Sequence, residues 1–200
     1  MKNIPRILFI LLGLLALVVV FLTADFNFAR SETNSQHNLT TIRQGYEIPT
    51  PTPIEQNLTV AVVGEGAFAD KLREAILTEL AASRLAPQGQ WLATSDTNSQ
   101  ALHLVVRVDH TSSLWTPVYA QATVKATLGY ASDHDLSWHG TLPISMETDH
   151  DAPLLWATGE FELSDSSRGL LSRPAYQRIL AEKMAAEIVQ SLNRLYTQGG

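Results

Sequence analysis

The sequence predicts an α+β protein, a two-layer sandwich in which a mostly antiparallel sheet carries two helices on one face and is preceded by one transmembrane helix. Three observations predict this fold. Several segments place apolar residues at every second position, which is typical of strands with one apolar and one polar face. Two segments place apolar residues at every fourth position, so each predicts a helix with one apolar stripe, and two such helices suffice to cover one face of a sheet. An uncharged run near the N-terminus predicts the transmembrane helix.

The apolar run covers residues 7–23 and reads ILFILLGLLALVVVFLT. At about 1.5 Å per residue it forms about 25 Å of helix, and the residues just before it extend this to the thickness of a bilayer. Lys2 and Arg6 precede the run, so the positive-inside rule places residues 1–6 in the cytoplasm. A cleaved signal peptide is the alternative, but the run is longer than the usual core of about 7–15 residues and no small-x-small cleavage site follows. We therefore expect a single-pass protein of the cytoplasmic membrane, with its C-terminal domain periplasmic or extracellular.

The remainder of the chain divides into a stem and one domain. Residues 24–57 are mostly polar and end in alternating prolines, which predicts a semi-rigid extracytoplasmic stem. Residues 58–200 form one extracytoplasmic α/β domain, large enough to bury a core. The chain has no cysteine, which excludes disulfides, thiolate metal ligands and lipid attachment through a thiol. Its formal net charge is −6 and it has no basic patch, so nucleic acid is not an expected partner.

The domain begins with a strand and a helix. The segment 58–63, LTVAVV, is a short apolar run typical of a strand. Phe68, Leu72, Ile76 and Leu80 then recur every four residues with charged residues between them, which predicts an amphipathic helix that faces the core.

A run of strands and a closing helix follow. Strands are predicted over 102–108, 118–130, 136–146 and 154–163. Pro143 makes the third of these an edge strand or a bulged one. Pro174 suits the first turn of a helix that continues to about Tyr196. The apolar stripe of this helix consists of Tyr176, Leu180, Met184, Ile188 and Leu192.

The turn between the first strand and helix, residues 64–69, fits the G-x-G-x-x-A form of the dinucleotide-binding fingerprint. Three features argue against a nucleotide site. A dinucleotide fold needs central strands that are apolar on both faces, whereas the strands after the first helix alternate. Glu65 would place a carboxylate beside a pyrophosphate, and Asp96 lies too far along the chain for the expected ribose ligand. Gly64 and Gly66 are better explained by a tight entry into the helix.

Two Asp-His-Asp triplets, Asp133-His134-Asp135 and Asp149-His150-Asp151, have the residue types of a zinc or manganese site. Each flanks one end of the predicted strand 136–146, which spans on the order of 35 Å, so the two triplets are expected at opposite edges of the sheet unless Pro143 folds the strand back. Polar hairpin loops are the simpler interpretation, and we expect no metal site.

Other polar groups are predicted to be surface charge. His103, Arg107 and Asp109 share the polar side of one strand, and Glu160 and Glu162 share the polar side of another. No G-x-S-x-G elbow presents a serine as a nucleophile. We therefore expect no catalytic residue, no cofactor and no enzymatic activity.

The polar face of the strand 118–130 is the predicted partner surface. Tyr119, Gln121, Thr123 and Lys125 point to this face by alternation. Trp115, in the preceding loop, either caps the core or offers an aromatic anchor to a partner.

Three segments carry a resemblance to a known family: LTVAVVGEGAFADKLREAILTELAAS, ALHLVVRVD and YQRILAEKMAAEIVQSLNRLY. Their order of apolar strand, helix, further strands and closing helix resembles the lipopolysaccharide-assembly lipoprotein (LptE-like) family and, more distantly, curli-secretion lipoproteins. The resemblance implies an accessory of envelope assembly rather than an enzyme. It assigns no functional residue, and this chain lacks the cysteine that carries lipid in those proteins.

The sequence as a whole predicts a membrane-tethered binding or assembly module of the cell envelope, with another envelope protein or a surface polymer as its partner. The alternative is an extracytoplasmic hydrolase or nucleotide-binding enzyme that uses the Gly64–Gly66 turn or the Asp/His loops. A concave pocket with convergent polar side chains would favour the enzyme, and a flat polar sheet with a free edge strand would favour the binding module.

Overall fold

A computed structural model describes residues 4–44, 58–83, 91–94, 103–131, 137–139, 142–145 and 154–197 of the chain. The described helices are α1 (Ile4–Thr23), α2 (Ala67–Ala82) and α3 (Arg173–Thr197). The described strands are β1 (Asn27–Gln44), β2 (Leu58–Val63), β3 (Trp91–Thr94), β4 (Leu104–Thr116), β5 (Tyr119–Ala131), β6 (Ser137–His139), β7 (Leu142–Ser145) and β8 (Leu154–Leu171). The predicted positions of β2, α2, β5 and α3 are confirmed to within a few residues.

Six of the strands form one mixed sheet in the order β1-β8-β5-β4-β2-β3, and β6 and β7 form a separate hairpin. The pairs β1–β8, β8–β5 and β5–β4 are antiparallel, whereas β2 pairs in parallel with both β4 and β3. The prediction of a mostly antiparallel sheet is therefore wrong. The physical reason is α2, which returns the chain to the start of β2 and so makes the next strand parallel to it.

The predicted stem over residues 24–57 also needs correction. Residues 27–44 form β1, an 18-residue strand at the edge of the sheet that pairs with β8 along its whole length. Ala29 and Leu39 are the apolar side chains of β1 that are described as packing against the main core, and the His37 ring stacks on the buried Phe161, so β1 carries no apolar alternation that could have identified it. The folded unit therefore begins before residue 58, and the proline-rich segment lies outside the described residues.

The predicted transmembrane helix is the third correction. In the part of the chain that the structure describes, no helix is long and apolar enough to cross a membrane. The predicted anchor over residues 7–23, and the single-pass localisation deduced from it, are thereby withdrawn.

Polar contacts join the end of α1 to the start of α3. Ser172 is the N-cap of α3, because its Oγ accepts a hydrogen bond from the Ala175 N–H at 3.3 Å. The same Oγ accepts from the Phe26 N–H at 3.1 Å. Arg178 donates two hydrogen bonds to the Asp25 carboxylate, from Nε to Oδ2 at 3.0 Å and from Nη2 to Oδ1 at 3.2 Å. These bonds fix where β1 begins relative to α3.

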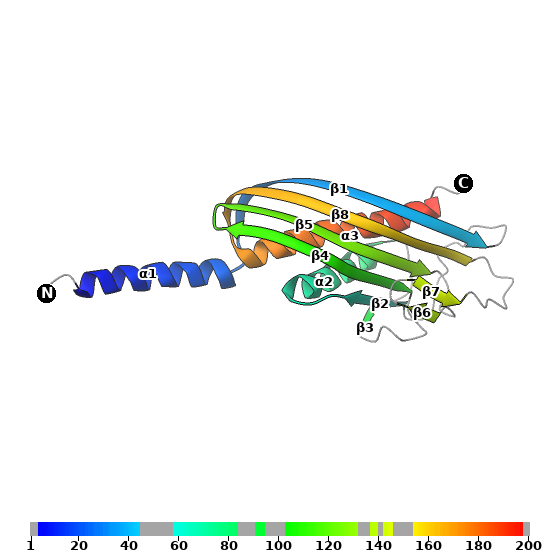
Figure 1. The fold of residues 1–200 in the computed structure, drawn as a ribbon, viewed down its shortest axis with the longest axis horizontal. Coiled ribbons are helices and arrows are strands. Elements are labelled where there is room, and N and C mark those ends of the chain that lie inside the picture. The colour runs from blue at the N-terminus through cyan, green and yellow to red at the C-terminus, as the bar shows by residue number, and fades with distance from the viewer. Residues whose placement is uncertain are drawn as a thin grey trace.

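Helices α2 and α3 lie together on one face of the sheet, and the hydrophobic core fills the space between (Figure 1). The residues at the centre of this core are less than 3% exposed. They are Leu72, Ile76 and Leu80 of α2, Leu180, Met184 and Ile188 of α3, and Ala120, Ala122, Val124, Ala126, Leu128 and Leu163 of the sheet. The small alanines of β5 let the helices approach closely. The opposite face carries a second, smaller cluster of buried apolar residues, Ala61, Val105 and Ala131, at one end of the sheet and polar residues over the remainder of β5 and β8.

Truncation of this core is expected to cost far more than truncation on the free face. Leu180→Ala or Ile188→Ala should each lower the free energy of unfolding by about 2–5 kcal/mol, because a cavity replaces a buried side chain. Thr123→Ala on the opposite face of β5 should change it by less than about 0.5 kcal/mol. Chemical denaturation measures all three variants, and similar losses on both faces would contradict the one-sided core.

Candidate functional site: the outer face of the sheet

A β-bulge in β4 determines which side chains reach the outer face, meaning the face of the sheet opposite α2 and α3. The β4–β5 register shifts between Val108 and His110, so Asp109 is an extra residue with no partner of its own on β5. After the bulge, His110 and Ser112 lie opposite outer residues of β5. The bulge therefore places Arg107, Asp109 and His110 close together on one face.

Five consecutive rows of the outer face cross four strands and, except for Leu114, consist of polar residues. In the order β4, β5, β8 and β1, they are Arg107–Thr127–Glu160–Asn38, His110–Lys125–Glu162–Gln36, Ser112–Thr123–Ser164–Asn34, Leu114–Gln121–Ser166–Glu32 and Thr116–Tyr119–Arg168–Arg30. Directly opposed residues on neighbouring strands point to the same face, so each row is a set of side-chain neighbours. The result is a broad hydroxyl- and amide-bearing surface.

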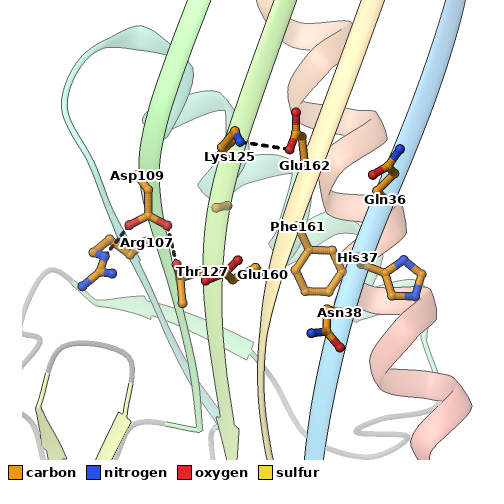
Figure 2. A pocket seen from close by; sticks show the side chains of 11 residues that line it. Gln36, His37, Asn38, Arg107, Asp109, Lys125, Thr127, Glu160, Phe161 and Glu162 are labelled. Atoms are coloured by element: carbon orange, nitrogen blue, oxygen red, sulfur yellow. Dashed lines mark hydrogen bonds and ion pairs between the residues drawn. The ribbon is translucent and has the colours of Figure 1, made fainter.

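The first two rows surround a shallow concavity of about 460 Å³. Within it, Arg107 Nε lies 2.6 Å from Asp109 Oδ1, and Asp109 Oδ2 accepts a hydrogen bond from the Thr127 hydroxyl. Lys125 Nζ lies 3.0 Å from Glu162 Oε2 (Figure 2). Both ion pairs are partly exposed, so they organise the surface more than they stabilise the fold.

The structure brings together four of the five residues predicted for the partner surface. Tyr119, Gln121, Thr123 and Lys125 lie in successive rows of the outer face. Trp115 does not join them, because the bulge turns it to the helix side, opposite the buried Ala120. There its Nε1 donates to the Leu171 carbonyl at 3.2 Å and its ring packs against the core.

The other polar residues considered from the sequence lie at different places in the fold. Arg107 and Asp109 meet as described, whereas His103 is buried and its Nδ1 accepts from the Thr59 N–H at 3.4 Å. Glu160 and Glu162 both line the concavity, the latter engaged by Lys125. The two Asp-His-Asp triplets lie outside the described residues, and among those described no group of histidine and acidic residues could hold a metal.

The glycine turn is shaped by packing. Gly66 is the N-cap of α2 with φ of 83°, a conformation that favours glycine. A Cβ on Gly64 would lie 3.1 Å from the Val108 Cβ and 3.3 Å from the Ala69 Cβ. The first glycine therefore lets the turn approach β4, and the second allows the chain to enter α2.

Sequence analysis missed a buried polar cluster on the helix side of the sheet. The Asp165 carboxylate on β8 has no exposed side-chain surface. Its Oδ1 accepts from Ser31 Oγ at 2.5 Å and from Thr33 Oγ1 at 2.6 Å, and lies 3.0 Å from Lys183 Nζ. Its Oδ2 accepts from Ser167 Oγ at 2.9 Å. The only signal in the sequence is an aspartate at a position that alternation assigns to the core.

The charge state of this cluster follows from its contacts. Burial by itself would raise the pKa of Asp165, but the hydrogen bonds from Ser31, Thr33, Lys183 and Ser167 outweigh burial and hold that pKa below its usual range. Burial and the neighbouring Asp165 charge raise the pKa of Tyr176. The carboxylate is thus ionised, satisfied on both oxygens and enclosed, which suits a structural clamp rather than a catalytic acid.

Comparison with known proteins identifies no family and no function for this chain. No family model and no curated protein matches the chain. Solved structures of PelC dodecamers from Paraburkholderia phytofirmans are similar at 14% identity. For a point variant of PelC the TM-score is 0.37, and the match covers 80% of this chain and 98% of the PelC chain. For PelC in another crystal form the TM-score is 0.35, and the match covers 74% of this chain and 95% of the PelC chain. Likenesses of this strength carry no argument about this chain, and they leave the LptE-like resemblance untested.

Removal of the buried carboxylate should destabilise the protein and should make its unfolding free energy less dependent on pH in the acidic range. Asp165→Ala leaves Lys183 without its counter-ion and should cost about 3–5 kcal/mol. Because the folded pKa of Asp165 lies below the unfolded value of about 3.9, its stabilisation is complete above that value and is lost as pH falls through the folded pKa. The unfolding free energy of the wild type should therefore fall more steeply below about pH 4 than that of Asp165→Asn. Glu162→Gln, which breaks an exposed pair, should cost less than about 1 kcal/mol.

The glycine turn should not bind nucleotides. Val108 and Ala69 pack against Gly64, and Glu65 is exposed at the turn where a phosphate would have to approach. Addition of NAD or ATP to the full chain should cause no thermal shift and no heat in a titration. Micromolar binding that Gly66→Val abolishes would reverse this conclusion.

Proposed function

We propose that this protein is a non-catalytic binding or assembly module that holds its partner on the outer face of the sheet. The observation that carries the proposal is that the two faces of the sheet differ in composition. All of the main core lies on the helix side, whereas four adjacent strands present five consecutive rows on the other side that are polar except for Leu114. Such a surface is broad enough to follow an extended partner.

The state of the charged groups in the concavity favours binding over catalysis. Asp109 is held by Arg107 and Thr127, and Glu162 is held by Lys125. A general base or nucleophile needs a reactive atom that is free to meet the substrate. Of the three carboxylates that line this concavity, Asp109 and Glu162 instead hold neighbouring side chains in place, which suits a preorganised hydrogen-bonding surface.

The composition of the outer face favours a hydroxyl-rich polymer, such as a polysaccharide, as the partner. Protein interfaces usually have a core of aromatic and apolar side chains surrounded by a polar rim. The middle rows here have the opposite character, with serine, threonine, asparagine and glutamine at their centre. Hydroxyl and amide groups both donate and accept hydrogen bonds, as the hydroxyls of a sugar chain do.

A protein partner is the second candidate, and one specific feature favours it. Four apolar side chains are exposed at the end of the sheet next to the β4–β5 turn: Phe28 (78%), Val118 (60%), Leu114 (59%) and Leu170 (49%). Phe28 and Leu170 are directly opposed on β1 and β8, so they form a contiguous pair. A photo-crosslinker at Leu170 that captures a protein, while one at Thr123 captures nothing, would favour this candidate.

Site-specific crosslinking in cells tests the proposed surface. Photo-crosslinkers at Thr123 and Lys125 should capture the partner, because both side chains lie in the middle rows of the outer face. A crosslinker at Glu74, on α2 at the opposite side of the molecule, is the matched control and should capture nothing. Digestion of the products with glycosidases or proteases then distinguishes a polysaccharide from a protein.

The same experiment can refute the surface. Crosslinks that form only from Glu74 would place the partner on the helices. Hydrolytic activity of the purified chain that Glu160→Gln abolishes, with folding intact, would make the concavity an active site instead.

A further inference from the structure

The free edge of β1 supports an inference that goes beyond the proposed function. β1 lies at the end of the strand order and pairs with β8 over 18 residues without a register shift. Within the described residues, β8 is the only strand that pairs with it. In an antiparallel edge strand, every second residue turns its N–H and C=O away from the sheet. One such amide is visible, because the Ala29 N–H donates to Asn27 Oδ1 on its own strand at 2.9 Å.

β1 lacks most of the features by which proteins usually protect an edge. Its sequence, NFARSETNSQHNLTTIRQ, contains no proline and no lysine, its pairing with β8 shows no bulge, and its charged residues are limited to Arg30, Glu32 and Arg43. The opposite edge of the sheet is formed by β3, which has only four residues. α1 leaves from the start of β1 and projects beyond the end of the sheet, so it does not run along this edge (Figure 1).

We propose that β1 pairs antiparallel with β1 of a second copy of this chain, so that the two sheets join about a two-fold axis. A parallel in-register pair would place Arg30 opposite the partner's Arg30 and Glu32 opposite the partner's Glu32, which is unfavourable. Pairing of β1 with the partner's β3 would satisfy only four residues of the edge. An antiparallel pair uses the same surface on both copies, as two-fold dimers do.

The charges of α3 beside this edge indicate the register. Lys183 Nζ bonds to Ser31 Oγ at 2.6 Å and to Thr33 Oγ1, and Glu187 Oε2 lies 3.9 Å from His37 Nδ1. The midpoint between Thr33 and His37 on β1 is Ser35. A two-fold axis at Ser35 directs Lys183 toward the partner's Glu187. Both side chains remain 31% exposed and are therefore accessible from that side.

This register also suits the strand itself. It pairs residues 27–43 with the same segment of the other copy and so uses almost the whole length of β1. Asn34 falls opposite the partner's Gln36, and Arg30 opposite the partner's Thr40, so no two like charges are directly opposed. The joined sheets then present the polar rows of both copies as one continuous outer face.

Two double variants of the full chain test the pairing by charge. Asn34→Lys with Gln36→Lys places like charges directly opposite across the axis, and both positions face solvent in the single chain. This variant should raise the dissociation constant of the dimer about tenfold in sedimentation experiments. The matched control, Asn34→Lys with Gln36→Glu, places opposite charges together and should dimerise at least as tightly as the wild type. Equal thermal unfolding of both variants would show that the fold is intact.

Distance measurements on the same dimer test the register. Because the natural chain has no cysteine, single spin labels can be attached at Asn34→Cys or Thr40→Cys. Across the proposed axis, the two copies of residue 34 lie two residues apart along the strand direction, and the two copies of residue 40 lie ten residues apart. Dipolar spectroscopy should therefore give a label-to-label distance of less than about 20 Å for position 34 and about 34 Å for position 40.

Three outcomes would overturn the proposal. The full chain could remain monomeric at every concentration tested. The two charge variants could dimerise equally, which would indicate association through another surface, such as the exposed apolar side chains of α1. The two labels could give distances in the reverse order. None of these results depends on a ligand of the outer face, so failure here is distinguishable from failure of the proposed function.

Discussion

The carboxylate of Asp165 lies where β1, β8 and α3 meet, and much of the fold depends on the bonds it makes there. β1 is a polar strand that contributes few side chains to the core. Hydrophobic burial therefore cannot be what selects its position in the sheet. The ladder with β8 supplies backbone bonds, but a ladder alone would tolerate a slip in register. Ser31 and Thr33 bond to one fixed acceptor, and Lys183 reaches the same place from the helix, so a slip would leave a buried charge unpaired.

This clamp has a consequence for the surface of the protein. Because polar contacts hold β1 from the inner side, its outer side chains are not needed for stability. They extend the polar rows of β8 by one more strand and complete the rim of the concavity with Gln36 and Asn38. The same arrangement leaves the far edge of β1 without a neighbouring strand among the described residues. The proposed binding surface and the proposed pairing edge thus both depend on the way in which β1 is held.

The bulge at Asp109 has a comparable effect on β4. Without the extra residue, alternation would continue from Val106 and Val108, and Trp115 would reach the outer face. With it, the tryptophan seals the core next to Leu171, and Asp109 is free to bond with Arg107 and Thr127. Bulges commonly redirect side chains in this way at functional sites. Here one residue separates the aromatic group from the polar rows.

The sequence by itself determined the helices and strands in which buried side chains recur at regular intervals. The four-residue spacing of α2 and α3 and the two-residue spacing of β5 follow from contact with a single core, so the apolar pattern records them directly. The outer positions of Tyr119, Gln121, Thr123 and Lys125 follow from the same alternation. Only the tertiary structure decided the remainder. β1 is held by hydrogen bonds to a distant strand and helix, the bulge depends on the register with β5, and the parallel pairs of β2 depend on where α2 returns the chain. Each of these rests on contacts between residues far apart in the chain, and such contacts leave no periodic trace in the local sequence.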